Sequence, residues 1–236
     1  MTEAGHVGIV ADLWRYPVKS FGGESTRRTF IGPFGPIGDR RHAVVNREGE
    51  PLSARRQSRL LGYRAHYADS EAVEDVRVAT PDGRVLSLDD PDLETELDRL
   101  LDRPVAFERS GQGFPDAGHV HLVTVQSIAA LGEAVGEDLD RRRFRPNVVI
   151  ELEQDEPFAE GSWPDSTMRL GERVELRVVV QTERCAVTTF DPDTLDRDKR
   201  VHEAIARTRE NFFGVYAQVV RSGWVSVGDR VGIERG

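Results

Sequence analysis

Hydrophobic residues in the first half of the chain occur in short runs, which segments rich in glycine and proline separate. These runs predict short strands over residues 7–14, 42–46, 63–68, 76–79, 84–88 and 105–108. The turn sequence Thr80-Pro81-Asp82-Gly83 joins two of these strands into a hairpin. Residues 30–38 hold three glycines and two prolines, so we expect a turn region there and no helix.

Three helices are predicted from apolar residues that recur at the spacing of one helical face. The first begins after Asp90, which can cap it, and Pro91 suits its first turn. Pro104 is expected to end this helix, because proline cannot continue it. Ser127 is the expected cap of the second helix, and the third covers residues 196–208.

The second half of the chain adds further strands over residues 121–125, 148–152, 173–180, 215–220 and 224–233. The loose segment 110–118 is expected to connect the two halves. Many short strands, glycine-rich turns and few helices predict a mainly β fold with peripheral helices, built from small β-barrels. The regular strand–helix alternation of a parallel sheet is absent from the pattern.

Composition narrows the class of protein. The chain has 236 residues, enough for one large or two modest domains, and its 38% hydrophobic and 31% charged residues indicate a globular protein. A net charge of −9 argues against sequence-independent binding to nucleic acid. No apolar run approaches the roughly 18 residues of a membrane helix, and residues 1–10 lack a signal-peptide pattern. We therefore expect a cytoplasmic protein.

Cys185 is the only cysteine of the chain. It cannot form an intrachain disulfide or a Cys-x-x-Cys pair, and alone it cannot hold zinc or an iron–sulfur cluster. An inert buried thiol, a nucleophile and a single soft ligand to a metal remain open. Arg184 beside it favours the thiolate, and the polar residues 188–193 after it favour a thiol that is used.

Basic residues gather in four loop segments, and such loops commonly converge at one mouth of a barrel. If they do so here, they form a site for a phosphate or carboxylate, which guanidinium groups bind bidentately. A lone thiol beside such a site suggests a soft-metal cofactor that carries its own phosphate. The four segments are Lys19 with Ser20, Arg40 with Arg41, Arg55 with Arg56, and residues 141–145, which Asn147 follows.

Other familiar sites have less support in the sequence. His119 and His121 alternate at the start of a strand, so both can face one metal ion, but no third ligand stands nearby. There is no glycine-rich phosphate loop and no serine-centred nucleophile elbow. Neither Lys19 nor Lys199 has a context that asks for a pyridoxal Schiff base.

Three motifs, in this order along the chain, resemble the MOSC family, which is named for the C-terminal domain of molybdenum-cofactor sulfurase. They are Tyr16-Pro17-Val18-Lys19-Ser20, the segment Phe144-Arg145-Pro146-Asn147 with the strand after it, and the segment 184–194 around Cys185. The resemblance covers nearly the whole chain. It implies a MOSC N-terminal β-barrel-like domain over residues 5–109 and a MOSC β-barrel domain over residues 110–236.

The resemblance also implies a cofactor, the molybdenum cofactor Mo-molybdopterin, with Cys185 as the protein ligand to the metal and as a catalytic residue. By the same resemblance Asp191 lies beside the site and assists proton delivery, while Arg184 tunes the ligand. The residues matching cofactor contacts are Lys19, Ser20 and Arg40, mainly near the phosphate, and Arg145 and Asn147. The sequence departs from the family at Leu195, where a glycine is usual, and around His119, where relatives carry small hydroxyl residues.

The amidoxime-reducing members of the family imply the reaction, a reduction of small N-hydroxylated substrates. The chain has no cysteines for a ferredoxin domain, so electrons would come from a separate donor of the ferredoxin or flavin reductase type. Two other interpretations stay open. Cys185 can carry a persulfide or hand on the cofactor, as a sulfur carrier or cofactor carrier does. The pocket can also serve another anion in a binding protein.

Overall fold

The computed structural model describes residues 5–69 and 71–235, and its centre is a closed β-barrel of seven strands. All neighbouring strands of the barrel are antiparallel except β10 and β11. Valine, leucine and isoleucine side chains from every strand fill the interior. Around the barrel, the strands are β1 (Gly5–Arg15), β11 (Val148–Leu152), β10 (Val120–Thr124), β14 (Phe212–Arg221), β13 (Val174–Glu183), β12 (Thr167–Leu170) and β16 (Arg230–Glu234).

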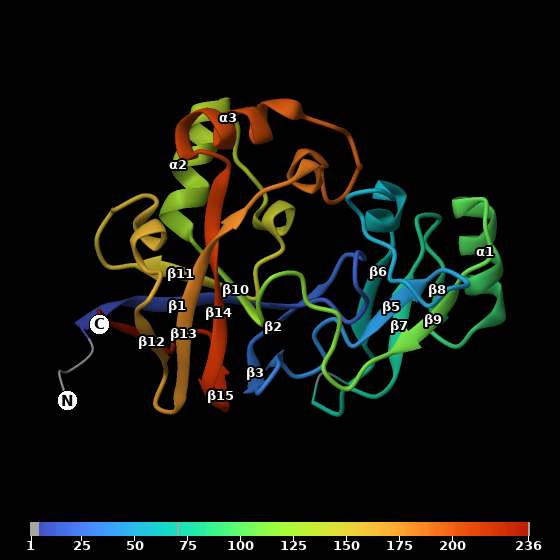
Figure 1. The fold of residues 1–236 in the computed structure, drawn as a ribbon, viewed down its shortest axis with the longest axis horizontal. Helices are drawn as coiled ribbons and strands as arrows, with labels where there is room; N and C mark the ends of the chain where they lie inside the picture. The colour runs from blue at the N-terminus through green and yellow to red at the C-terminus, as the bar shows by residue number, and fades with distance from the viewer. Residues whose placement is uncertain (1–4, 70, 236) are drawn as a thin grey trace.

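β1 closes the barrel, although it comes from the start of the chain and both of its barrel neighbours come from the second half. It pairs with β11 on one side and with β16 on the other, and Val10 and Leu13 are fully buried in the core. Figure 1 shows this blue strand crossing the red and orange strands. The end of β1 therefore has a fixed place beside the second half of the chain. The predicted division into domains 5–109 and 110–236 stays a prediction.

A second, smaller unit lies beside the barrel, to the right in Figure 1. Its core takes up Val18 and Phe21, so the chain passes from the barrel into the second core directly after β1. The strands and helices of this unit are β5 (His42–Val45) paired with β9 (Ala106–Arg109), β6 (Arg64–Tyr67), β7 (Val76–Ala79) and β8 (Val85–Ser87), the short helix η1 (Ser58–Gly62), and α1 (Pro91–Leu101).

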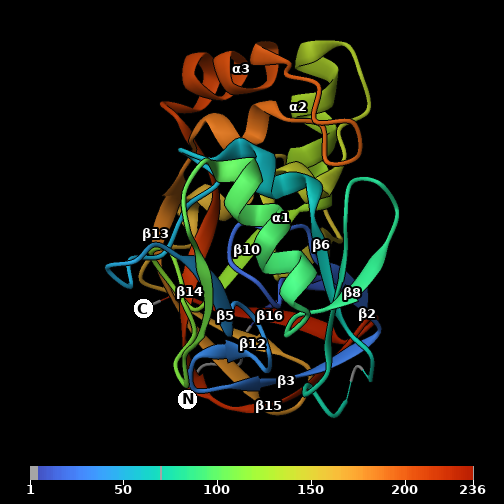
Figure 2. The same cartoon turned by 90° about the vertical axis from the view of Figure 1, so that its right-hand side faces the viewer.

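α1 covers the face of this unit that Figure 2 turns toward the viewer. The predicted cap is confirmed, because the Asp90 side chain accepts a hydrogen bond from the backbone N–H of Asp92, and Pro91 occupies the first turn. The helix ends before Pro104, at Leu101. Asp102 follows it in the left-handed conformation, with φ of 53°, and closes the last turn through its own N–H.

α2 (Val125–Val135) and α3 (Lys199–Arg209) pack together on the barrel, at the top of both ribbon views. The predicted cap of α2 at Ser127 is wrong. Thr124 caps the helix by accepting from the N–H of Ser127, because the chain turns from β10 straight into the helix. α3 begins later than predicted, at Lys199, since Asp198 forms its cap.

The segment 30–38 holds strands as well as a turn, so the prediction of a turn region is wrong in part. The short strands β3 (Arg28–Gly32) and β4 (Gly35–Pro36) form a hairpin there, and β3 pairs with β15 (Gly223–Ser226). Gly35 allows the tight turn, because its φ is +98° and a Cβ would stand 2.2 Å from the His119 carbonyl oxygen. β2 (Glu24–Thr26) and β12 were likewise not predicted, since their apolar patterns are too short.

The predicted class is confirmed: the fold is mainly β, with a closed barrel and peripheral helices. None of the helices in the described ranges has both the length and the apolar character needed to cross a bilayer. The short helices η2 (Arg141–Phe144), η3 (Ala159–Ser162) and η4 (Ala186–Thr189) complete the fold, and η2 and η4 lie against each other.

His42 in β5 makes the stability of this fold depend on pH. Burial, together with Arg109 and Arg41, lowers the pKa of its imidazole from 6.5 to about 4. Between these two values the unfolded chain binds a proton that the folded chain does not. The free energy of unfolding should therefore fall as the pH drops from about 6.5 to 4, by up to about 1.4 kcal/mol per pH unit from this group.

Urea unfolding of the parent chain and of His42→Gln, measured at several pH values, tests this contribution. We expect a shallower fall in stability for the variant over that pH range. Parallel curves for the two proteins would show that His42 is not the group responsible.

Candidate active site

A cavity of about 630 Å³ opens where the barrel meets the second unit. Its volume lies within the roughly 300–1,000 Å³ usual for small-molecule sites. Its wall combines the only thiol of the chain, Cys185, with several cationic side chains. Four of these cations come from the four basic loop segments that the sequence predicted to converge, and they are Lys19, Arg40, Arg55 and Arg145. The fifth, Arg184, precedes the thiol directly in the chain.

Backbone hydrogen bonds fix the cationic side chains of the second unit at the end of β1. The N–H of Lys19 donates to the carbonyl of His42 over 2.7 Å, and the N–H of Arg40 donates to the carbonyl of Tyr16 over 2.6 Å. The Lys19 ammonium donates to Asp116 over 2.6 Å, and Arg40 pairs with Asp39. Both cations are thereby held at the wall of the cavity.

Arg40 and Arg145 both stack on the ring of Tyr16, with guanidinium carbons 4.9 and 4.3 Å from its centroid. Arg145 also donates to the carbonyl of Phe21 over 2.6 Å. Burial and the nearby Arg40 lower the pKa of Arg145 from its usual value, although the group stays charged at neutral pH. The ring of Tyr16 is therefore a shared contact surface for two cations of the cavity wall.

Cys185 lies between β13, which ends at Glu183, and η4, which begins at Ala186. The carbonyl of Cys185 accepts from the N–H of Thr188 over 3.1 Å and from its hydroxyl over 3.0 Å, so the chain folds back at this residue. The thiol is half-buried at the cavity wall. Arg184 before it donates to the carbonyl of Phe144 over 2.9 Å, and its Nη1 lies 3.3 Å from His121 Nε2.

The cavity carries more positive than negative charge. Lys19 and Arg40 have carboxylate partners, but no ion pair involves Arg145 or Arg184 in the described part of the chain. Although loss of hydration opposes it, Arg40 and Lys19 lower the pKa of Asp116, which is therefore ionised. This carboxylate is 58% exposed, so water screens it. An anionic ligand would complete the balance of charge.

Two predicted contact residues use their polar atoms to build the site. The Ser20 hydroxyl accepts from the N–H of Ala54 over 2.8 Å and donates to the carbonyl of Leu52 over 3.2 Å, which fixes that loop at the cavity wall. Asn147 lies behind the wall, where its side chain accepts from the N–H of His121 and donates to the carbonyl of Trp14. Ser20 lines the cavity, whereas Asn147 is not among its lining residues.

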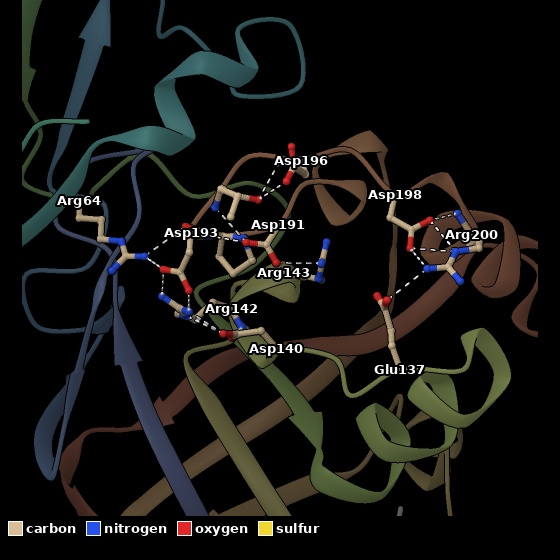
Figure 3. Close-up of polar contacts among 12 residues, drawn as sticks. Arg64, Glu137, Asp140, Arg142, Arg143, Asp191, Asp193, Asp196, Asp198 and Arg200 are labelled. Carbon is tan, nitrogen blue, oxygen red and sulfur yellow. Dashed lines mark hydrogen bonds and ion pairs between the residues drawn. The ribbon is translucent and has the colours of Figure 1, made fainter. Parts of the chain in front are cut away.

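Asp191 lies in the polar network of Figure 3, outside the lining of the main cavity. Its carboxylate accepts from the N–H groups of Asp193 and Thr194 over 2.9 and 3.0 Å, and from Arg143 over 3.0 Å. It borders a separate hollow of about 40 Å³. The structure thus brings Asp191 into a turn and not into contact with the space beside Cys185.

The same network ties the turn after Cys185 to both units of the fold. Asp193 pairs with Arg64 from β6 of the second unit and with Arg142 from η2 of the barrel half (Figure 3). Leu195 in this turn has a φ of +61°, the left-handed conformation that glycine adopts most readily. Leu195 therefore adopts the left-handed backbone conformation that a glycine at this position would favour.

The two histidines predicted as a possible metal pair are divided between different surroundings. His121 lines the cavity, whereas the ring of His119 packs on Phe34 with centroids 5.7 Å apart. No group of three or more histidine, cysteine, aspartate or glutamate side chains suited to a metal occurs within the described ranges. Sequence reasoning missed His121, Asp116 and Tyr216 as cavity residues. The one signal was the alternation of His119 and His121, and neither Asp116 nor Tyr216 stands in a recognisable motif.

Family models match both halves of the chain. Residues 110–232 match the MOSC domain, and residues 7–111 match the MOSC N-terminal beta barrel domain. Mitochondrial amidoxime reducing component 2 of Rattus norvegicus is 28% identical, over 95% of this chain and 83% of the relative. Mitochondrial amidoxime-reducing component 1 of Homo sapiens is 26% identical, over 95% of this chain and 82% of the relative.

Among solved structures, the YUAD protein of Bacillus subtilis has a similar fold. The two superpose with a TM-score of 0.55 at 13% sequence identity, over 98% of this chain and 97% of the other. At this identity the likeness concerns the fold alone.

Gly214 in β14 provides the space for the ring of His121. Its φ is +80°, and a Cβ there would stand 2.7 Å from His121 Nε2 and from the Leu122 carbonyl oxygen. Gly136 has the same φ of +80°, but a Cβ there would meet no atom within 4 Å from the rest of the described chain. Gly136→Ala should lower the free energy of unfolding by about 1 kcal/mol through the backbone conformation alone. Gly214→Ala should lower it by about 2 kcal/mol more, because the added Cβ overlaps His121 Nε2 and the Leu122 carbonyl oxygen.

Chemical denaturation of the two alanine variants measures this difference. Equal losses of stability in Gly214→Ala and Gly136→Ala would contradict the close packing of the strand against His121.

Proposed function

Because the chain belongs to the MOSC family, as its three motifs predicted, we propose that it binds a molybdenum cofactor in the cavity and reduces N-hydroxylated compounds. One observation carries the proposal: the only thiol of the chain lines a cavity with surplus positive charge. The names of the amidoxime-reducing relatives support the reaction class.

The residues present fit such a cofactor. A thiolate is a soft ligand that suits a thiophilic metal, and Cys185 can supply one at the cavity wall. Guanidinium and ammonium groups suit the phosphate of a pterin cofactor. Arg184 Nε is buried and has no hydrogen-bond partner within residues 5–69 and 71–235. A bound anionic group would satisfy this donor.

Distinct roles follow for the side chains around the cavity. We assign Cys185 to the metal, and Lys19, Arg40 and Arg145 to the phosphate and the pterin. Ser20 and Asn147 hold the wall, since their side-chain hydrogen bonds run to the backbone. When bound, the cofactor would supply the two electrons that cleavage of an N–O bond requires.

Asp191 is better placed to shape the turn after Cys185 than to contact a substrate. Its carboxylate already accepts three hydrogen bonds from Arg143 and the turn backbone. A role for Asp191 in proton delivery stays a prediction. Among the side chains that line the cavity, Lys19, Tyr216 and His121 carry exchangeable protons.

Electrons must reach the cavity from elsewhere under this proposal. One cysteine cannot hold an iron–sulfur cluster, so we propose a separate donor protein of the ferredoxin or flavin reductase type. A persulfide carrier would use the same thiol, and the test below separates the two functions.

Metal content tests the proposal, with Lys19 and Lys199, the only lysines of the chain, as a matched pair. Full-length protein from a host that makes molybdopterin should contain near-stoichiometric molybdenum and pterin. Cys185→Ser should lower the molybdenum content about tenfold, since the protein ligand is lost. Lys19→Ala should lower occupancy severalfold, whereas Lys199→Ala, on the exposed start of α3, should not change it. Elemental mass spectrometry and pterin fluorescence provide the two readouts.

Reduction of an amidoxime with a chemical electron donor completes the test, because the natural donor is then not needed. Activity that follows molybdenum content across the variants supports the proposal. A persulfide on Cys185 without metal, even after reconstitution with the cofactor, would favour the sulfur-carrier function instead. Undiminished activity in Cys185→Ser would contradict the assignment of the ligand.

A further inference from the structure

His121 makes two polar contacts through its ring in the wall of the cavity. The residue stands in β10 and is only 2% exposed. Its Nδ1 lies 3.3 Å from the carbonyl oxygen of Arg145, and its Nε2 lies 3.3 Å from Arg184 Nη1. The imidazole therefore stands between the backbone of one cavity arginine and the side chain of another.

Only one form of the ring satisfies both contacts. A carbonyl oxygen can only accept, so Nδ1 must carry the hydrogen, and a guanidinium can only donate, so Nε2 must present its lone pair. Burial, and then the nearby Arg184, hold the pKa of His121 well below its usual range, which keeps the ring neutral. The neutral Nδ1–H tautomer is thus fixed from both sides.

Within residues 5–69 and 71–235, the side-chain partners of Arg184 are all neutral. Its Nη2 donates to the carbonyl of Phe144, and its Nη1 donates to His121 Nε2. Its guanidinium carbon lies 5.8 Å from the centroid of the Phe144 ring. Arg40, by contrast, is paired with the carboxylate of Asp39. A carboxylate in the place of His121 would fix Arg184 equally well, but it would cancel its charge.

The surroundings hold the ring of His121 in this position. Asn147 accepts from its backbone N–H over 3.1 Å, and the ring of Tyr216 packs on it with centroids 5.0 Å apart. Gly214 leaves the space beside Nε2 that any side chain would fill. Several elements therefore converge on the placement of this one imidazole.

We infer that His121 is a positioning residue, which holds the Arg184 guanidinium next to Cys185 through its Nε2 lone pair and leaves the positive charge uncompensated. The purpose of this charge rests on the proposed function, because it would attract the anionic groups of the cofactor toward the metal ligand. The positioning itself concerns only residues of this chain, so it can be tested without cofactor.

The single cysteine makes a direct test possible. Iodoacetate and iodoacetamide alkylate a thiolate in the same way: a carbon–sulfur bond forms and iodide leaves. Only iodoacetate carries a negative charge, so the ratio of its rate to that of iodoacetamide reports the local field, while the thiolate fraction cancels. Cofactor-free protein with the whole chain would come from a host unable to make the pterin. The Arg184→Gln variant gives the reference value of the rate ratio when the guanidinium charge is absent.

We expect the ratio to fall severalfold, to about a fifth of the parent value, in Arg184→Gln, since two unit charges at contact distance in water interact with about this effect on a rate. The rate ratio of His121→Glu should approach that of Arg184→Gln, because its carboxylate cancels the charge of Arg184. The ratio of His121→Leu should lie between these low values and that of the parent. His121→Gln should stay within about twofold of the parent, since its amide oxygen can accept from the Arg184 guanidinium and its NH₂ group can donate to the backbone carbonyl of Arg145.

Equal ratios in His121→Gln and His121→Glu, which have the same shape, would overturn the inference even if His121→Leu does not fold. So would a ratio in Arg184→Gln that matches the parent. Far-UV circular dichroism establishes that each variant compared is folded. Because no metal or pterin takes part, these outcomes are independent of molybdenum content, and either hypothesis can fail alone.

Discussion

The pairing of β1 with β11 and β16 is the constraint on which the rest of the structure depends. This first strand completes a barrel whose other strands all come from residues beyond 119. Closure removes the open edges that a partial barrel would expose. It also fixes the point at which the chain leaves the barrel, so that Lys19 arrives at the cavity while Val18 and Phe21 enter the second core.

Positive charge in the cavity is arranged according to the nature of its partners. The cations supplied by the second unit, Lys19 and Arg40, face carboxylates, whereas Arg145 and Arg184 rest on carbonyl oxygens and aromatic rings. Burying a cation without a counter-charge is costly unless its donors are satisfied. Carbonyl and imidazole acceptors satisfy several of these donors without adding negative charge. The cavity therefore still attracts anions, although the whole chain has a net charge of −9.

Local chemistry explains which features the sequence could predict. Asp90 with Pro91 marks a helix start by itself, and the loops carrying Lys19, Arg40 and Arg145 were expected to converge because they follow strands of a barrel. Ser127 was mistaken for the cap because a serine before an apolar helical pattern can either cap the helix or use its hydroxyl elsewhere. Here the Ser127 hydroxyl donates to the buried Glu160. His121 was considered only as a metal ligand, because its contact partner Arg184 lies 63 residues away along the chain.

The position of the cavity between two cores has a thermodynamic consequence. The thiol belongs to the barrel half, whereas the ammonium of Lys19 belongs to a loop anchored on the second core. A ligand that contacts both walls binds only while both cores are folded, so its binding free energy is added to the stability of each. Occupancy of the cavity would therefore make the barrel and the second unit unfold together in one cooperative transition. The ion pairs of Asp193 with Arg64 of the second unit and Arg142 of the barrel half also couple the unfolding of the two units.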